Sequence, residues 1–274
     1  MKILDGVRVV NLAVNLPGPA AASRLGRMGA EVIKVEPPAG DPMEVYFPDW
    51  YRDMCSGHTV YRLDLKSGEG KMELFSLLEG ADALLSASRP SAMARLGLDP
   101  ETLHERFPAL CQVMIVGYAP PRENEPGHDL TYQASMGLLY PPHMPRSLLS
   151  DIAGAERAVT ELLGLLLHRQ RTGKGAHVFV PLAEAVSAFA DPVHYGSTLP
   201  GASLGGALPE YNLYRTADGG WVAVAALEPH FKKKLESLLQ VSCLEGYRAV
   251  FASQDTSFWQ TWAEEHDLPV EPVR

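Results

Sequence analysis

The sequence predicts an α/β protein: a Rossmann-like large domain with a parallel sheet, followed by a small α+β domain. Through the first third of the 274 residues, short apolar runs alternate with amphipathic stretches, as strands and crossover helices do in a parallel sheet. Further on, Ala217-Asp218-Gly219 separates two β-rich runs, and Asp-Gly in that position is a strong hairpin signal. We expect the large domain to cover residues 1–195 and the small domain residues 196–274.

The elements of the large domain follow from the apolar runs and from the residues that interrupt them. Leu16-Pro17-Gly18-Pro19 separates the first strand from the first helix, and Gly29 is suited to end that helix. Residues 41–58 mix aromatics, prolines and charges without a usable period, which predicts an ordered loop. The expected strands are 7–12, 31–35, 59–63, 83–86, 110–116 and 176–180, and the expected helices are 20–28, 67–79, 129–139, 151–170 and 182–195.

The longest expected helix, residues 151–170, carries leucines and valines around nearly its whole circumference. Such a helix is expected to be buried on most sides and to lie at the centre of the molecule. In the small domain, strands 211–216 and 220–225 flank the Asp-Gly turn. The residues from 229 to 263 are mostly amphipathic helix.

Composition and charge exclude several classes of protein. Hydrophobic residues make up 46% and charged residues 21%, which excludes disordered, coiled-coil and collagen-like chains. The formal charge is -9 and no basic run exceeds the three lysines 232–234, so a nucleic-acid partner is not expected. No apolar stretch approaches the ~20 residues that span a bilayer, so no membrane association is expected either. Three widely spaced cysteines without C-x-x-C spacing indicate reduced thiols in a cytoplasmic protein and no cysteine-based metal site.

Three polar residues stand where chemistry is possible, and each also has a plain structural explanation. His128 precedes a helix, and an imidazole in that position can titrate near neutral pH and take part in catalysis. The structural explanation is that Asp129 caps that helix and His128 is an ordinary surface residue. Asp151 begins the apolar helix, where it can simply be the N-cap residue. Alternatively, it is a carboxylate of unusual basicity beside free backbone N–H groups, which would form an oxyanion site. Glu228 either complements the dipole of the next helix or belongs to a site.

A set of short motifs follows in a fixed order along the chain, and together they resemble the family III CoA-transferases, also called the CaiB/BaiF superfamily. The resemblance covers essentially all 274 residues, and the ordered set is more specific than any single motif. The motifs are Leu4-Asp5-Gly6-Val7-Arg8-Val9-Val10, Leu16-Pro17-Gly18-Pro19, Gly29-Ala30-Glu31-Val32-Ile33-Lys34-Val35-Glu36, Leu63-Asp64-Leu65-Lys66, Arg89-Pro90, Leu96-Gly97-Leu98, Gly127-His128-Asp129, Asp151 with Gly154, and Arg171-Thr172-Gly173-Lys174-Gly175.

The resemblance implies a fold, a ligand and an assembly. The Rossmann-like half is expected to bind coenzyme A as an acyl-CoA substrate, with no metal. The family's chains pair as interlocked homodimers, so a homodimer is expected. Because this chain ends at Arg274, before the segment by which family members return to the large domain, a more open dimer is one expectation. The implied phosphate or adenine contacts are Lys34, Arg62, Arg89 and Arg95.

Two chemistries compete within the family. In the transferases, the aspartate that matches Asp151 is a nucleophile that forms an acyl anhydride, which CoA then attacks. In the racemases, a histidine and an aspartate, here His128 and Asp151, remove and return the α-proton of a 2-methyl-branched acyl-CoA. There Glu228 would orient or tune His128.

Three segments resemble the racemase branch: Gly127-His128-Asp129, residues 208–219 and Ala226-Leu227-Glu228-Pro229. Racemization is therefore the favoured expectation. Ile152-Ala153-Gly154-Ala155, which follows the aspartate, is closer to many transferases, so the transferase stays open as the alternative. A catalytically inactive CoA-binding paralogue is the third possibility.

Overall fold

The computed structural model describes residues 2–274 and divides into two compact units, one ending at Phe189 and the other spanning Ala190–Arg274. The division falls inside helix α10 (Ser187–His194), close to the boundary expected after residue 195. Within the described residues, no helix combines the length and apolar character that crossing a membrane requires.

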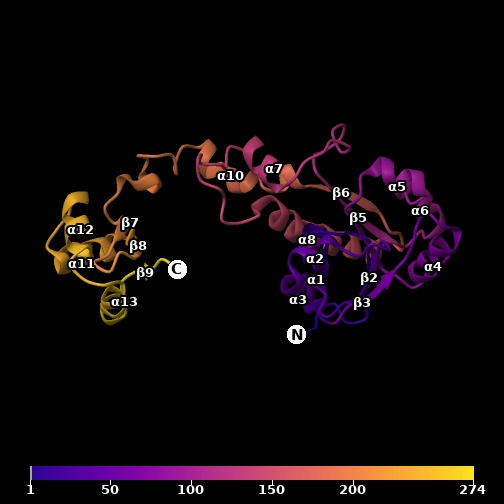
Figure 1. The fold of residues 1–274 in the computed structure, drawn as a ribbon, viewed down its shortest axis with the longest axis horizontal. Coiled ribbons are helices and arrows are strands. Elements are labelled where there is room, and N and C mark those ends of the chain that lie inside the picture. The colour runs from indigo at the N-terminus through magenta and orange to yellow at the C-terminus, as the bar shows by residue number, and fades with distance from the viewer. Residues whose placement is uncertain (1) are drawn as a thin grey trace. The chain divides into compact units, whose positions relative to one another are not determined.

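The larger unit is built on a six-stranded parallel sheet of order β3-β2-β1-β4-β5-β6 (Figure 1). The order runs outward in both directions from the β1–β4 pair, as in Rossmann folds, and confirms the predicted fold class. The strands are β1 (Arg8–Asn11), β2 (Glu31–Glu36), β3 (Thr59–Arg62), β4 (Ala83–Ser86), β5 (Cys111–Val116) and β6 (His177–Pro181).

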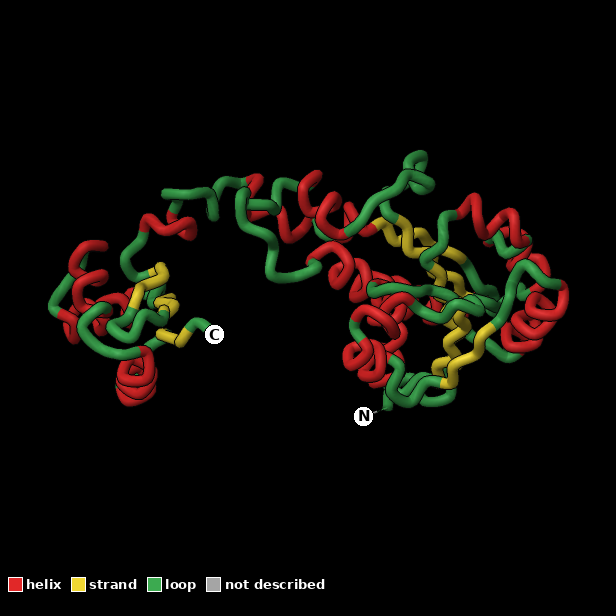
Figure 2. Tube along the Cα trace, in the orientation of Figure 1, coloured by secondary structure: helices red, strands yellow, loops and turns green. Residues whose placement is uncertain are grey.

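Helices cover both faces of this sheet (Figure 2). Successive side chains of a strand point to opposite faces, so Val9 joins the core beneath α1 and α8, while Val10 joins the core beneath α4, α5 and α6. The helices of the larger unit are α1 (Pro17–Arg27), α4 (Gly68–Glu79), α5 (Pro90–Leu96), α6 (Pro100–Arg106), α7 (Asp129–Ser135), α8 (Leu149–Thr172) and α9 (Leu182–Ala185).

The expectation of a loop at residues 41–58 is wrong, because this segment forms two short helices, α2 (Pro42–Tyr46) and α3 (Pro48–Met54). A proline opens each of them. Proline lacks an N–H and fixes φ, which suits the first helical position although it interrupts a helix elsewhere. The side chain of Asp41 caps α2 by accepting a hydrogen bond from the N–H of Met43 at 3.0 Å.

Helix α8 differs from its prediction in start and burial. It begins at Leu149, two residues before the expected start. Its first half is buried through Ala155, Ala158 and Leu162, whereas in its second half Leu167 is 48% exposed. The expectation of burial on most sides therefore holds only for the half that packs under the sheet.

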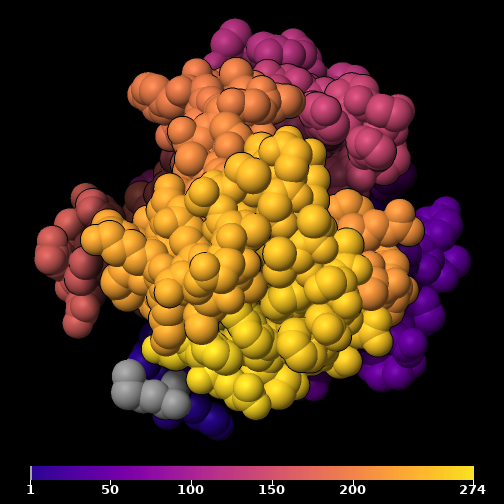
Figure 3. All heavy atoms as spheres, turned by 90° about the vertical axis from the view of Figure 1, so that its left-hand side faces the viewer, coloured from indigo at the N-terminus to yellow at the C-terminus, as the bar shows by residue number. Residues whose placement is uncertain are grey.

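The smaller unit contains a three-stranded antiparallel sheet of order β7-β8-β9, covered by helices, and forms one continuous surface in the space-filling view (Figure 3). The predicted hairpin is confirmed, and Asp218 in its turn accepts a hydrogen bond from Thr256 Oγ1 at 2.9 Å. The ring of Tyr214 stacks on that of Phe251 in the core, with 4.9 Å between the ring centroids. The elements are η1 (Ser203–Ala207), β7 (Tyr211–Arg215), β8 (Trp221–Ala225), α11 (Pro229–Leu239), α12 (Leu244–Phe251), α13 (Thr256–Glu265) and β9 (Val270–Pro272).

Candidate active site

A cavity of about 260 Å³ lies at the carboxyl ends of the parallel strands. Asn15 after β1 and Arg89 after β4 line it, as do Gly117 after β5 and Leu182 after β6. Because β1 and β4 are the neighbours at which the strand order reverses, the cavity occupies the position where open α/β sheets bind ligands.

His128 and Asp151 both line this cavity. His128 is exposed and immediately precedes α7, and its N–H donates a hydrogen bond to Thr131 Oγ1 at 3.0 Å. Asp151 is half-buried in the first turn of α8. Two residues 23 positions apart in the chain, both singled out in the sequence, thus reach the same site.

Asp129 does not act as expected. His128, not Asp129, is the N-cap residue of α7. The buried carboxylate of Asp129 instead caps the other helix: its Oδ1 accepts hydrogen bonds from the backbone N–H groups of Ser150 at 2.8 Å and Asp151 at 3.1 Å. A cap supplied by a different helix has no local sequence signal, which is why it was missed.

This cap occupies backbone N–H groups that the expected oxyanion site at the start of α8 would use. The N–H groups of Ser150 and Asp151 already donate to Asp129, and that of Ile152 donates to the carbonyl of Leu148 at 3.0 Å. A helix N-terminus stabilises an anion through N–H groups that have no other acceptor. Asp129 supplies such an anion from within the chain, so the oxyanion site stays an expectation for which these two N–H groups already have an acceptor.

Asp151 has an altered acidity. Burial, and secondly the negative charge of Asp129, raise the pKa of Asp151 from 3.8 to about 7. Both forms of the carboxyl are therefore populated near neutral pH. A side chain with such a pKa is suited to accept and return a proton.

Tyr132 is a cavity residue that the sequence did not reveal. It is buried, and burial is the main cause that raises its pKa to about 12, with the charge of Asp151 adding to the effect. Its ring lies so close to two glycines that a Cβ at Gly117 would come within 2.5 Å of Oη and one at Gly127 within 2.4 Å of Cε1. Glycine is needed at both positions for Tyr132 to pack here.

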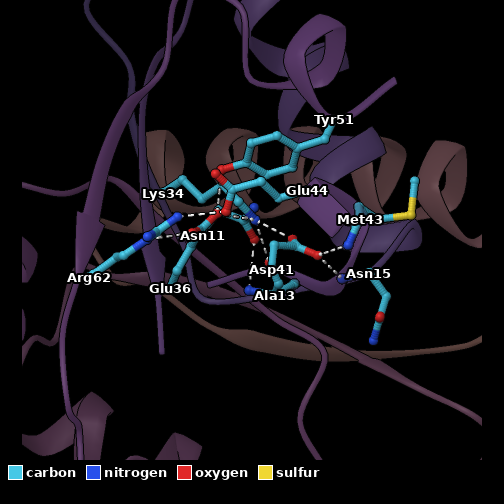
Figure 4. Close-up of polar contacts among 10 residues, drawn as sticks. All are labelled: Asn11, Ala13, Asn15, Lys34, Glu36, Asp41, Met43, Glu44, Tyr51 and Arg62. Carbon is cyan, nitrogen blue, oxygen red and sulfur yellow. Dashed lines mark hydrogen bonds and ion pairs between the residues drawn. The ribbon is translucent and has the colours of Figure 1, made fainter. Parts of the chain in front are cut away.

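Lys34, expected to contact coenzyme A, is fully buried and lies among the acidic residues Asp41 and Glu36, as Figure 4 shows for these contacts. Its Nζ lies 2.7 Å from Asp41 Oδ2 and 3.5 Å from Glu36 Oε1, and donates to the carbonyl of Ala13 at 3.2 Å. The ammonium charge is thus compensated within the protein. Because Lys34 is inaccessible to a ligand, this geometry assigns it a structural role and not that of a phosphate contact.

The three arginines named with Lys34 are placed differently from one another. Arg62 is half-exposed at the end of β3 and pairs with Glu44 at 2.6 Å and Glu36 at 3.6 Å (Figure 4). Arg89 is exposed and lines the cavity. Arg95 is exposed in the last turn of α5 and is not among the residues that line the cavity.

Glu228, the third expected catalytic residue, belongs to the smaller unit. It is exposed and occupies the N-cap position of α11, directly after the hairpin. Its role toward His128 stays an expectation from the resemblance. Among residues 2–274, no three or more His, Cys, Asp or Glu side chains are grouped as metal ligands.

The parallel sheet, with a cavity at its switch point that is lined by a histidine and by an aspartate whose pKa is about 7, defines a Rossmann-like protein with a candidate active site. The sequence profile of CoA-transferase family III matches residues 4–249. This chain therefore belongs to CoA-transferase family III.

Similar proteins include members with either of the two chemistries. Alpha-methylacyl-CoA racemase of Mus musculus is 33% identical over 248 residues, which cover 84% of this chain and 62% of the racemase. Succinyl-CoA–D-citramalate CoA-transferase of Chloroflexus aurantiacus is 32% identical over 250 residues, covering 81% of this chain and 61% of the transferase. The chain thus spans about three fifths of the length of each.

The fold has a solved counterpart. The crystal structure of a hypothetical protein from Mycobacterium tuberculosis superposes with a TM-score of 0.84 at 26% identity, covering 100% of this chain and 86% of that one. The fold of this chain is therefore shared along its whole described length by a solved protein.

Proposed function

We propose that this protein acts on acyl-CoA thioesters as a racemase of 2-methyl-branched acyl chains, by removing and returning the α-proton. The observation that carries the proposal is that His128 and Asp151 line one cavity and that the pKa of Asp151 is about 7. One group removes the proton from one face of the α-carbon, and the other returns it to the opposite face.

The acidity of Asp151 favours proton transfer over nucleophilic attack. A nucleophilic carboxylate must be ionised, and burial beside Asp129 opposes ionisation. A general acid/base works best with a pKa near the operating pH and contributes about 10²- to 10⁴-fold to the rate. The racemase reaction thus uses the raised pKa that the site gives to Asp151.

Coenzyme A is the proposed carrier of the substrate, and the reaction needs no metal ion. Arg89 supports phosphate binding, because it is exposed at the cavity and carries a permanent charge. Arg62 and Arg95 remain proposed contacts by resemblance. Glu228 is proposed to orient or tune His128, also by resemblance to the racemase branch.

We further propose that the protein works as a homodimer in the cytoplasm. The partly exposed leucines of the second half of α8 line a shallow apolar groove with Leu4 and Val7, a surface that a second subunit would cover. Free thiols at all three cysteines fit a reducing compartment. Sedimentation at micromolar concentration tests the dimer, and a monomer there would contradict it.

The test of the reaction is α-proton exchange in heavy water with a 2-methylacyl-CoA and no acceptor acid. We expect deuterium uptake and inversion at the α-carbon in the unaltered protein. His128→Ala and Asp151→Asn should each abolish both. His104→Ala, which changes a histidine on α6 outside the cavity, should leave the rate unchanged.

The alternative is a CoA-transferase that works through an aspartyl acyl anhydride at Asp151, supported by the similarity to the Chloroflexus aurantiacus transferase. Transfer of CoA to a second carboxylic acid, without exchange and stopped only by Asp151→Asn, would replace the racemase proposal with this one. Acetyl-CoA binding without either reaction would favour the inactive CoA-binding paralogue.

A further inference from the structure

We propose that Asp129 is a positioning residue of this site: its buried carboxylate anchors the first turn of α8 and keeps a second negative charge beside Asp151. The proposal rests on the acid/base role proposed above for Asp151. It goes beyond that role because it assigns a task to a side chain that lies outside the cavity lining.

The geometry shows what Asp129 holds in place. Its Oδ1 accepts the N–H groups of Ser150 and Asp151, and its Oδ2 accepts Gln133 Nε2 at 2.6 Å. The same Gln133 nitrogen donates to the carbonyl of Ser147 at 3.0 Å. Asp129 therefore joins α7 to the segment before α8 and to the first turn of α8.

Because this network is buried, each of its groups depends on its present hydrogen-bond partners. Asp129 is 4% exposed and Gln133 is fully buried, so water does not replace a lost partner. All three groups that reach Asp129 are N–H donors, and a carboxylate offers an accepting oxygen to each of them. A negative charge at this position also complements the N-terminus of a 24-residue helix.

Several charged or titratable groups line the cavity together with Asp151, and they come from different elements. They are Tyr132 on α7, His128 before it, Arg89 after β4, and Glu123 and Glu125 in the loop that precedes His128. After burial, the charge of Asp129 is the other influence that raises the pKa of Asp151. Asp129 thus differs from these neighbours in combining a fixed hydrogen-bonded position with an electrostatic effect on Asp151.

Asp129→Asn separates the charge from the hydrogen bonds. The amide oxygen of asparagine still accepts the N–H groups of Ser150 and Asp151, while the negative charge is lost. Gln133 can accept from the new amide nitrogen by turning its own amide, since its Oε1 has no hydrogen-bond partner among the described residues, at the cost of its bond to the Ser147 carbonyl. The helix start is then retained, and circular dichroism verifies folding.

The direct measurement is the titration midpoint of the Asp151 carboxyl, followed by NMR in protein with ¹³C-labelled aspartate and no substrate. The signal is assigned by its absence from Asp151→Asn. We expect Asp129→Asn to lower the midpoint by about one pH unit or more, since a like charge nearby disfavours ionisation. An unchanged midpoint in folded Asp129→Asn would overturn the proposal.

Two further variants test whether the shift in midpoint is specific to the charge of Asp129. Glu125→Gln makes the same change of charge at a cavity carboxylate that does not hydrogen-bond to α8, and should shift the midpoint less. Gln133→Leu removes a donor from Asp129 but leaves its charge, so the midpoint should not fall. An equal shift in Glu125→Gln and Asp129→Asn would refute a special role for Asp129.

The activity profile supplies a second readout. In Asp129→Asn, the pH dependence of α-proton exchange should move to lower pH with the Asp151 midpoint, whereas KM for the acyl-CoA should change little. If the NMR midpoint shifts but no variant or unaltered protein exchanges protons, the proposed reaction fails and the role of Asp129 stands. If exchange occurs and the midpoint does not shift, the proposed reaction stands and the role of Asp129 fails.

Discussion

Lys34 and Asp41 form a fully buried ion pair, 2.7 Å from Nζ to Oδ2, beside the turn that leads into the candidate active site. Asp41 Oδ1 also accepts the N–H of Asn15 at 3.0 Å, and Lys34 donates to the carbonyl of Ala13. Asn15 has a left-handed backbone with φ of 67° and lines the cavity. The ion pair thus holds a strained turn at the edge of the site.

Lys34→Met should destabilise the protein strongly. The substitution leaves Asp41 buried without its cation, while Glu36 keeps its ion pair with Arg62, and breaking a buried ion pair costs about 3–5 kcal/mol. Urea unfolding measures the loss. Arg52→Ala is the matched control, because it removes an exposed ion pair with Asp49 on α3 and should cost little. Equal losses in the two variants would show that the buried pair is not required.

Asp151→Asn should make the protein more stable at alkaline pH. The pKa of Asp151 is about 7 in the folded protein against 3.8 for the ordinary group, so the folded state binds the proton more tightly than the unfolded chain. The unaltered protein therefore loses stability as pH rises from about 4 to about 7, by at most about 4 kcal/mol. Asparagine does not ionise and escapes this loss.

Urea unfolding of both proteins between pH 4.5 and pH 8 tests this sign. The advantage of the Asn variant should grow across the range and level off above pH 7. Asp49→Asn, at a carboxyl that is 90% exposed, should show no such trend. An Asn variant that is no more stable than the unaltered protein at pH 8 would mean that Asp151 is not held at a raised pKa.

The two glycines beside Tyr132 should respond differently to removal of its hydroxyl. An added Cβ at Gly117 meets Oη at 2.5 Å and the ring carbons at 3.2 Å or more, whereas at Gly127 it meets ring carbon Cε1 at 2.4 Å. Each glycine-to-alanine variant should lose about 1–3 kcal/mol through overpacking. Tyr132→Phe should rescue Gly117→Ala and should not rescue Gly127→Ala.

Double-mutant cycles from urea unfolding measure this difference. The coupling energy between positions 117 and 132 should be the larger one, because at Gly127 the clash with the ring carbons remains after the hydroxyl at 2.8 Å is removed. Rescue of both glycine variants by phenylalanine would show that the hydroxyl, and not the ring, sets the space at Gly127.

Arg89→Ala should weaken acetyl-CoA binding about 10- to 100-fold, the loss expected when a charge-assisted hydrogen bond of about 1.5–3 kcal/mol is removed. Calorimetry at low salt measures the dissociation constant. Arg95→Ala removes an equally exposed arginine that does not line the cavity, and its effect should be smaller. If the Arg95 variant loses more affinity than the Arg89 variant, the phosphate groups bind outside this cavity.

Local patterns in the sequence determined much of the fold. Apolar runs such as Val32–Val35 marked the parallel strands, and Asp218-Gly219 marked the hairpin, because strand burial and turn conformation depend on neighbouring residues. The helices α2 and α3 escaped notice because their opening prolines, Pro42 and Pro48, are also signals for chain breaks. Resemblance and position singled out His128 and Asp151 as candidates.

Tertiary structure decided what those candidates do. Asp129 accepts the N–H of Asp151, which is 22 residues further along the chain. Arg62 donates to Glu44, which is 18 residues earlier. The resemblance seen in the sequence offered Lys34 on β2 as a ligand contact, and only the fold, which places Asp41 at the N-terminus of α2 beside it, showed its charge to be buried. Acidity and accessibility depend on which charges and nonpolar groups the fold brings together, and such contacts between distant residues leave no periodic pattern along the chain.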